Sequence, residues 1–209
     1  MAIFSNGQTQ LAYEVHGAGF PILLIAPGGL RSERGMWRGS PLNPLAALRD
    51  HFQVIAMDQR NAGESAGPIE SDHDWSTYTQ DQLNLMTHLG HERFAVVGMC
   101  IGGPYILNLL KTAPERIVAS AVMQTIGRDN NRAEFLTMFD GWAEHLHAQD
   151  PQTYPSEALA GLRRRMFEND LTFMAMSDQV IKDFAAPMLI LDGADTYHPA
   201  SSSERLAQL

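Results

Sequence analysis

The fold of this 209-residue chain is decided by Gly98-Met99-Cys100-Ile101-Gly102-Gly103. An apolar run at residues 94–97 precedes this stretch, and a helix-like run at residues 105–110 follows it. A strand that turns sharply into a helix at a nucleophilic residue flanked by small residues is typical of a nucleophile elbow. The glycines remove side chains that would clash in such a tight turn, and the last glycine lets helix and strand approach closely.

The tip of the predicted elbow is Cys100, where serine is usual, and the sequence contains one cysteine only. An internal disulfide therefore cannot explain this residue. A lone cysteine in an apolar run is often just a small buried hydrophobe. The glycines on both sides, with a strand before and a helix after, favour a nucleophilic role for Cys100 instead.

Two further stretches follow predicted strands. The apolar run 22–25 leads into Ala26-Pro27-Gly28-Gly29-Leu30, and the run 53–57 leads into Asp58-Gln59-Arg60-Asn61-Ala62-Gly63-Glu64-Ser65. Together with the elbow, their order resembles the α/β-hydrolase family. That family has His-Gly-x after its third strand, Asp-x-Arg-Gly-x-Gly-x-Ser after its fourth and the elbow after its fifth.

The resemblance covers roughly residues 8–209 and departs from the family pattern at two motif positions. Pro27 stands in place of the histidine, and Asn61 stands in place of the first glycine of the second motif. Asparagine adopts left-handed backbone more readily than most other residues, so the second change is a mild one.

Alternating strands and helices predict an α/β fold with a mostly parallel, doubly wound sheet. The chain should open with a hairpin that turns at Asn6-Gly7. Helices are expected at 44–50, with Asn43 as a possible cap, and at 78–89, and strands at 117–123 and 187–191. The resemblance divides the chain into a core at 1–126, a helical cap insertion at 127–185, and a return to the core at 186–209 with the seventh strand and the acid loop.

Composition limits the partners. The net charge of −9 argues against binding to nucleic acid or an anionic membrane, because phosphates require clustered lysine and arginine. The one basic run, 163–165, has Glu157 and Glu168 near it and reads as a solvated helix face. The sequence shows no signal peptide and no apolar run of the ~18–20 residues that a membrane span needs. One unpaired cysteine suits a reducing compartment, so we expect a cytoplasmic protein.

The resemblance places a catalytic acid after the seventh strand. Residues 192–199 resemble the family loop Gly-x-x-Asp-x-x-x-Pro with one residue missing, and Asp195 precedes Pro199 by four. We therefore predict Asp195 as the acid that orients a histidine. Asp192, at the strand end, and Asp129, after the sixth strand, remain alternatives.

The catalytic histidine of the family lies beyond the acid, after one more helix and strand, whereas this sequence ends at Leu209. His198 is the one histidine on the acid loop, but its spacing of three residues from Asp195 is not that of the family. Three explanations stay open: a fragment of a longer protein, a removed C-terminal part, or a natural truncation that left a binding protein. We expect the first, because residues 188–191 would otherwise form a bare apolar edge, which a second copy of the chain could also cover.

The resemblance also implies an oxyanion hole. One backbone N–H should come from Ile101, and the other from the loop at 27–30, with Gly29 first and Leu30 next; Pro27 has no N–H to donate. Gly-x-Cys-x-Gly-Gly resembles the dienelactone-hydrolase branch, although that branch usually lacks a helical cap.

The predicted function is hydrolysis of a small ester, thioester or lactone through a Cys100 acyl-enzyme. The alternative is a non-catalytic relative that binds a small ligand or a protein partner. The sequence contains no spacing typical of metal ligands and no nucleotide-binding motif, so no metal or cofactor is expected.

Overall fold

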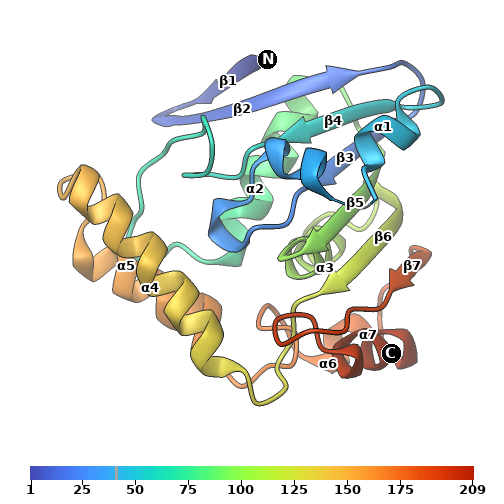
Figure 1. The fold of residues 1–209 in the computed structure, drawn as a ribbon. Coiled ribbons are helices and arrows are strands. Elements are labelled where there is room, and N and C mark those ends of the chain that lie inside the picture. Colours follow the sequence, from blue (N-terminus) through green and yellow to red (C-terminus); the bar gives the residue numbers. More distant parts are fainter. Residues whose placement is uncertain (41) are drawn as a thin grey trace.

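The structure is a computed structural model that describes residues 1–40 and 42–209. Within these residues seven strands form one sheet in the order β1-β2-β4-β3-β5-β6-β7 (Figure 1). The strands are β1 (Ala2–Asn6), β2 (Thr9–His16), β3 (Pro21–Ile25), β4 (Gln53–Met57), β5 (Phe94–Cys100), β6 (Ile117–Thr125) and β7 (Met188–Leu191). The helices are η1 (Gly29–Arg31), η2 (Arg34–Gly39), α1 (Pro44–Leu48), α2 (Trp75–His88), α3 (Gly102–Thr112), α4 (Arg132–Gln149), α5 (Ser156–Phe167), α6 (Asp178–Ile181) and α7 (Ala200–Gln208).

The sheet is mostly parallel, as the sequence predicts. The five strands from β4 through β3, β5 and β6 to β7 pair in parallel, while β1 and β2 add an antiparallel hairpin. Gly7 turns that hairpin with a φ of 61°, which a glycine adopts without steric cost. The structure thus confirms the α/β-hydrolase architecture of a mixed, mostly parallel sheet flanked by helices.

Both faces of the central strands are buried, which explains their continuous apolar runs. Along β3, Ile22 and Leu24 join a cluster under η2 and α1. Leu23 and Ile25 point the opposite way, into the larger cluster that α2 and α3 cover. The two helical layers hold the carboxyl ends of the parallel strands in place, and ligands of such sheets bind at those ends.

Capping residues set the helix boundaries. The helix predicted at 78–89 begins earlier, at Trp75, because Asp74 accepts the Ser76 N–H at 2.7 Å and Thr77 Oγ1 accepts the Asp74 N–H at 3.2 Å. The helix predicted at 44–50 ends at Leu48, and the predicted cap Asn43 does accept the Ala46 N–H at 3.2 Å.

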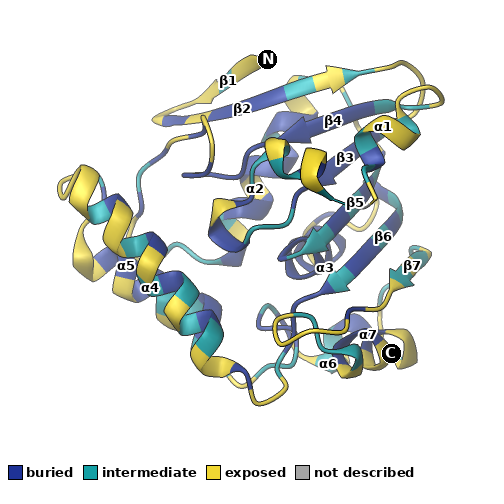
Figure 2. Ribbon diagram, in the orientation of Figure 1, coloured by how far each residue is buried: buried dark blue, intermediate teal, exposed yellow. Residues whose placement is uncertain are grey.

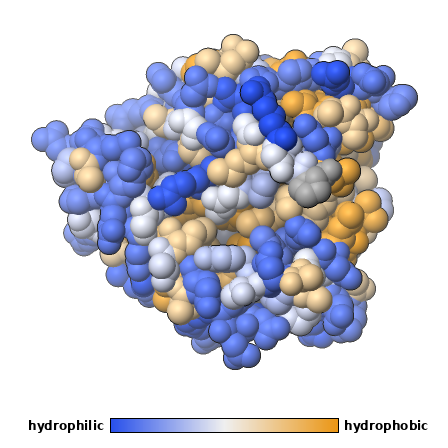
Figure 3. All heavy atoms as spheres, viewed as in Figure 1, coloured by the Kyte–Doolittle hydropathy of each residue, from blue (hydrophilic) through white to orange (hydrophobic). Residues whose placement is uncertain are grey.

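The segment between β6 and β7 is helical, with α4 and α5 standing apart from the sheet in Figure 1. Their inner faces are buried and their outer faces are exposed (Figure 2). In Figure 3 the surface over this helix pair, at the left, is mostly hydrophilic. Arg163 of α5 forms ion pairs with Asp140 and Glu168, so it ties the pair together.

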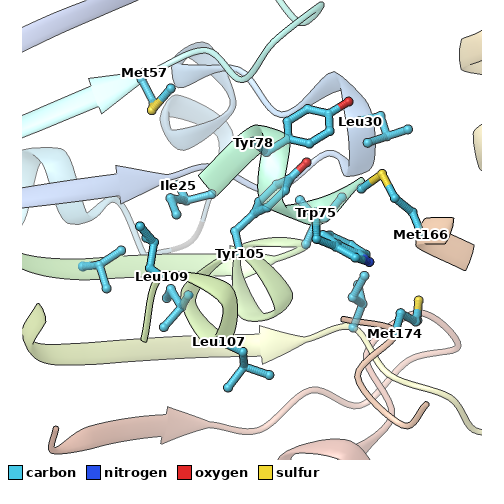
Figure 4. Close-up of a cluster of buried hydrophobic side chains, with 14 of the residues drawn as sticks. Ile25, Leu30, Met57, Trp75, Tyr78, Tyr105, Leu107, Leu109, Met166 and Met174 are labelled. Atoms are coloured by element: carbon cyan, nitrogen blue, oxygen red, sulfur yellow. The ribbon is translucent and has the colours of Figure 1, made fainter. Parts of the chain in front are cut away.

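Aromatic side chains join α4 and α5 to the core. Phe135 and Phe139 of α4 pack on Phe167 of α5, which packs edge-on against Trp75 of α2 at 5.7 Å between ring centroids. Figure 4 shows Trp75 beside two tyrosines from α2 and α3, with Leu30 of η1 and Met166 of α5 close by. The helix pair of α4 and α5 is therefore anchored to the core on the side where the elbow lies.

β7 forms one edge of the sheet, and Leu189 is 62% exposed there. Because an exposed apolar edge is prone to aggregation, we expect from the sequence that a further segment or a second copy of the chain covers it. That expectation stays a prediction. No helix among the described residues combines the length and apolar character required to cross a bilayer.

Candidate active site

The elbow has the strained geometry that its glycines predict. Cys100 ends β5 with a φ of 62°, a left-handed conformation that few non-glycine residues adopt. A Cβ added to Gly98 would lie 3.0 Å from Gly102 Cα, and one added to Gly102 would lie 3.1 Å from the Ile25 carbonyl oxygen. Both glycines are therefore required by close packing between strand and helix.

Gly103 carries the tightest contact of the elbow, since a Cβ there would overlap Thr125 Oγ1 at the end of β6. Replacing Gly103 with alanine should lower the free energy of unfolding by about 1–3 kcal/mol through overpacking. Urea unfolding followed by circular dichroism measures the change. Gly141→Ala in α4 is the matched control, because an added Cβ meets nothing within 4 Å there and alanine favours helix. Equal destabilisation of the two variants would contradict this account of the elbow.

The loop after β7 folds around Asp195. One carboxylate oxygen accepts the backbone N–H groups of Tyr197 and His198, both at 2.9 Å, and the other lies 2.9 Å from His198 Nδ1. The Asp195 N–H donates back to the His198 carbonyl oxygen at 3.3 Å. A Cβ on Gly193 would overlap His198, so glycine is needed for the loop to close in this way.

The loop brings His198 to the elbow. Its Nδ1 is engaged by Asp195, while its Nε2 is buried and has no hydrogen-bond partner among the described residues. The imidazole of His198 lowers the pKa of the Cys100 thiol, and the thiol in turn raises the pKa of His198. We refer to Cys100, His198 and Asp195 as a line of thiol, imidazole and carboxylate, joined by these mutual pKa shifts and by the Asp195–His198 hydrogen bond.

The groups of this line shift the pKa values of one another. Burial has the largest effect on Cys100 and opposes ionisation, but the hydrogen bond and charge of His198 and the N–H groups of Gly28 and Ile101 outweigh it and lower the pKa of the thiol. Burial alone would lower the pKa of His198, yet Cys100 and Asp195 raise it to about 9. Burial likewise works against ionisation of Asp195, while hydrogen bonds to His198 keep its pKa below the usual value.

Two backbone N–H groups act on the thiol. That of Ile101, at the start of α3, and that of Gly28, in the loop after β3, both lower the pKa of Cys100. Gly28 has a φ of 114°, which only glycine adopts readily. Gly29, the donor named from the sequence, follows directly and lies against Met138 of α4, which a Cβ there would overlap. Its role as a donor stays a prediction.

The structure shows the hydrogen-bond partners of two residues that the sequence analysis considered for the catalytic site, His198 and Asp129. The spacing of three residues between Asp195 and His198 argued against His198 as a base, but the turn of the loop makes the two side chains hydrogen-bonded neighbours. Asp129, an alternative acid, instead accepts a hydrogen bond from Ser201 at 2.7 Å. The signal that could have revealed His198 is Gly193, whose missing side chain the loop requires.

One group of potential metal ligands comes together among the described residues, at Glu70, Asp72 and His73 on the turn before α2. The two carboxylates are exposed, and His73 Nδ1 already accepts the N–H of Glu70 at 3.1 Å. The turn is built from local hydrogen bonds, and it contributes nothing to the line formed by Cys100, His198 and Asp195.

The elbow, the acid loop and the sheet define an enzyme of the hydrolase class. Residues 21–195 match the family model described as alpha/beta hydrolase fold, and the chain belongs to that family. It is similar to the putative carbamate hydrolase RutD of Klebsiella pneumoniae (strain 342), with 27% identity over 215 residues that cover 91% of this chain and 79% of the relative. The RutD of Azorhizobium caulinodans is 28% identical over 211 residues, covering 98% and 74% of the two chains.

Solved structures share the fold. A mutant of the meta-cleavage product hydrolase CumD superposes with a TM-score of 0.72 at 20% identity, covering 100% of this chain and 85% of that one. The enol-lactonase from Burkholderia xenovorans LB400 gives 0.71 at 19% identity, covering 99% and 87%. With the family match, the chain is therefore an α/β-fold hydrolase.

Proposed function

We propose that this chain hydrolyses small esters, thioesters or lactones with Cys100 as nucleophile, His198 as acid and base, and Asp195 as the residue that orients His198. The observation that carries the proposal is the hydrogen bond of 2.9 Å between Asp195 and His198, together with the mutual pKa shifts of His198 and Cys100. An imidazole held by a carboxylate and directed at a nucleophile is the arrangement that acyl-transfer catalysis needs.

In the acylation step, the thiolate of Cys100 attacks the substrate carbonyl carbon, and a C–S bond forms as the oxyanion develops. The Ile101 N–H and an N–H from the loop after β3, at Gly28 or Gly29, hold that oxyanion. The C–O bond to the leaving group then breaks, and His198 gives its proton to the departing alkoxide. In deacylation His198 takes a proton from water, which attacks the thioester and returns the thiolate.

The substrate class follows from the nucleophile and the relatives. A thiolate is a good leaving group, so the acyl-enzyme is reversible, and lactone opening or acyl transfer is as accessible as ester hydrolysis. The resemblance of Gly-x-Cys-x-Gly-Gly to dienelactone hydrolases favours a lactone. A carbamate is the second candidate, because curated relatives carry the name putative carbamate hydrolase.

We also assign residues 127–185 as a cap that shapes the substrate pocket. Met138 of α4 lies against Gly29, so this segment reaches the loop that supplies the oxyanion donors. Methionine is soft and adaptable, which suits a wall against the apolar part of a substrate.

The pH dependence of Cys100 alkylation tests the proposal directly, because the chain has a single cysteine. His198 lowers the pKa of Cys100, so the rate with iodoacetamide should rise with pH around a midpoint below the ~8.5 of a free thiol. Ester turnover should rise with pH as the Cys100 thiol loses its proton. It should fall near pH 9 as the imidazolium of His198 loses its proton. Intact-mass spectrometry measures the alkylation.

The comparison variant is His198→Asn, which removes the hydrogen bond and the charge that lower the pKa of Cys100. Its alkylation midpoint should move upward and its rate at pH 7 should fall. His51→Asn on the exposed turn after α1 is the control and should leave the profile unchanged. A wild-type midpoint at or above that of a free thiol would overturn the proposed thiolate–imidazolium pair.

A further inference from the structure

A hollow of about 480 Å³ lies between α4 and the loop that follows β4. Trp142 and Leu146 of α4 and Tyr154 of the α4–α5 connection line it from one side, and Met36 of η2 and Asn61 line it from the other. Asn61 is the residue that departs from the family motif, and it has the left-handed φ of 60° that the sequence led us to expect. The hollow is separate from the line of Cys100, His198 and Asp195.

The orientation of the Asn61 amide is fixed by its neighbours. Its Oδ1 accepts the Gly67 N–H at 2.8 Å and the Tyr154 O–H at 3.2 Å, both of which need an acceptor. Its main-chain oxygen accepts the Trp142 indole N–H at 3.4 Å. The side-chain NH2 group is left buried and without a partner among the described residues. A buried donor of this kind is costly unless a ligand or water accepts from it.

The charges around the hollow select the chemistry of that acceptor. Two carboxylates, Glu33 and Glu64, line it, against one guanidinium, that of Arg31, which already donates to the Gly141 carbonyl oxygen at 2.9 Å. Glu64 shares the guanidinium of Arg34 with Glu14 and Asp58, so one positive charge there faces three carboxylates. A carboxylate ligand would meet net negative charge here, whereas a neutral carbonyl oxygen could accept from the Asn61 NH2 group and leave its apolar part on Trp142.

Met36 connects the hollow with the elbow. Its thioether lines the hollow and lies against Gly28, where a Cβ would overlap it. Gly28 is one of the two residues whose N–H groups lower the pKa of the Cys100 thiol. The hollow and the oxyanion loop therefore share one flexible side chain as a wall.

We propose that this hollow binds the remote part of the substrate, a neutral group with an amide or ester carbonyl, and that the Asn61 NH2 group is its recognition donor. The proposal rests on the proposed hydrolase function, which supplies the substrate. It adds a specificity-determining residue at a position where the family motif has glycine.

The test compares two activated esters of equal chain length, p-nitrophenyl 4-acetamidobutyrate and p-nitrophenyl heptanoate. Asn61→Asp keeps the oxygen that Gly67 and Tyr154 require and replaces the NH2 group by an oxygen. It should raise KM for the acetamido ester about tenfold, because one hydrogen bond is lost and its donor is replaced by an acceptor. KM for the heptanoate should stay within about twofold of the wild-type value.

Two further variants sharpen the comparison. Asn61→Gly fits the left-handed φ and removes the whole amide, so it should give the same selective rise in KM even if the aspartate variant is unstable. Asn130→Asp is the matched control, because Asn130 also has a left-handed φ, of 55°, but is exposed and outside the hollow. It should leave the ratio of the two KM values unchanged. An unchanged ratio in both Asn61 variants overturns the inference.

A direct titration separates this inference from the proposed function. N-butylacetamide, a neutral amide with an apolar tail, should change the fluorescence of Trp142, and Trp142→Phe should remove that signal. Binding about tenfold weaker in Asn61→Asp supports the site even if neither ester is hydrolysed, in which case the proposed function alone fails. Equal binding by wild type and Asn61→Asp, or no binding, overturns the site.

Discussion

Replacing Cys100 with alanine should lower kcat/KM for p-nitrophenyl acetate by about 10⁴-fold or more, the scale on which loss of a nucleophile acts in acyl-transfer enzymes. Release of p-nitrophenolate measures the rate. The oxyanion donors remain in this variant, and they account for the residual rate that we expect above the uncatalysed reaction.

Cys100→Ser changes the nucleophilic atom and leaves the other groups of the site unchanged. Serine retains a nucleophilic atom but does not ionise at neutral pH, so His198 must remove its proton during the attack. Its rate should fall between those of the wild type and Cys100→Ala. Intact-mass spectrometry after brief mixing with the ester should detect an acetyl group on wild type and none on the alanine variant. Turnover by Cys100→Ala within tenfold of wild type would exclude Cys100 as the nucleophile.

The fold and the elbow were predictable because they depend on local rules. Apolar runs without alternation indicated buried parallel strands, and β4 begins and ends at the predicted residues 53 and 57. Glycines marked the close approaches at the elbow, where Gly98, Gly102 and Gly103 are confirmed as positions that reject a side chain. Asparagine at position 61 indicated left-handed backbone, which the structure also has.

The pairing of His198 with Asp195 was not predictable from the same rules. Sequence spacing cannot show that the loop after β7 turns back on itself, so His198 and Asp195 looked too close along the chain to act together. The turn depends on Gly193 and on reciprocal hydrogen bonds between Asp195 and His198. Likewise, the partnership of Asn61 with Trp142 and Tyr154 joins residues more than 80 positions apart, and no local pattern encodes such a contact.

The second large effect concerns stability. Asp81→Asn should lower the free energy of unfolding by about 3–5 kcal/mol, because it leaves the Arg60 guanidinium buried without a counter-charge. Arg60 donates from Nε and Nη2 to the two carboxylate oxygens of Asp81, both at 2.8 Å, and from Nη1 to the Pro68 carbonyl oxygen at 3.1 Å. Arg60 is 8% exposed and Asp81 is 3% exposed. Urea unfolding of the variant beside the wild type measures the loss.

The double variant Arg60→Leu/Asp81→Leu distinguishes a lost counter-charge from lost packing. It removes both charges together, so it should recover most of the stability that Asp81→Asn loses, since an apolar replacement of a buried pair is often neutral. Arg60 immediately precedes Asn61, and Asp81 lies on α2, so the pair also fixes the loop that lines the hollow. We therefore expect the double variant to keep its turnover of p-nitrophenyl heptanoate and to lose affinity for the acetamido ester, because the loop loses this anchor. A double variant as unstable as Asp81→Asn would show that packing around the pair, rather than charge compensation, supplies the stability.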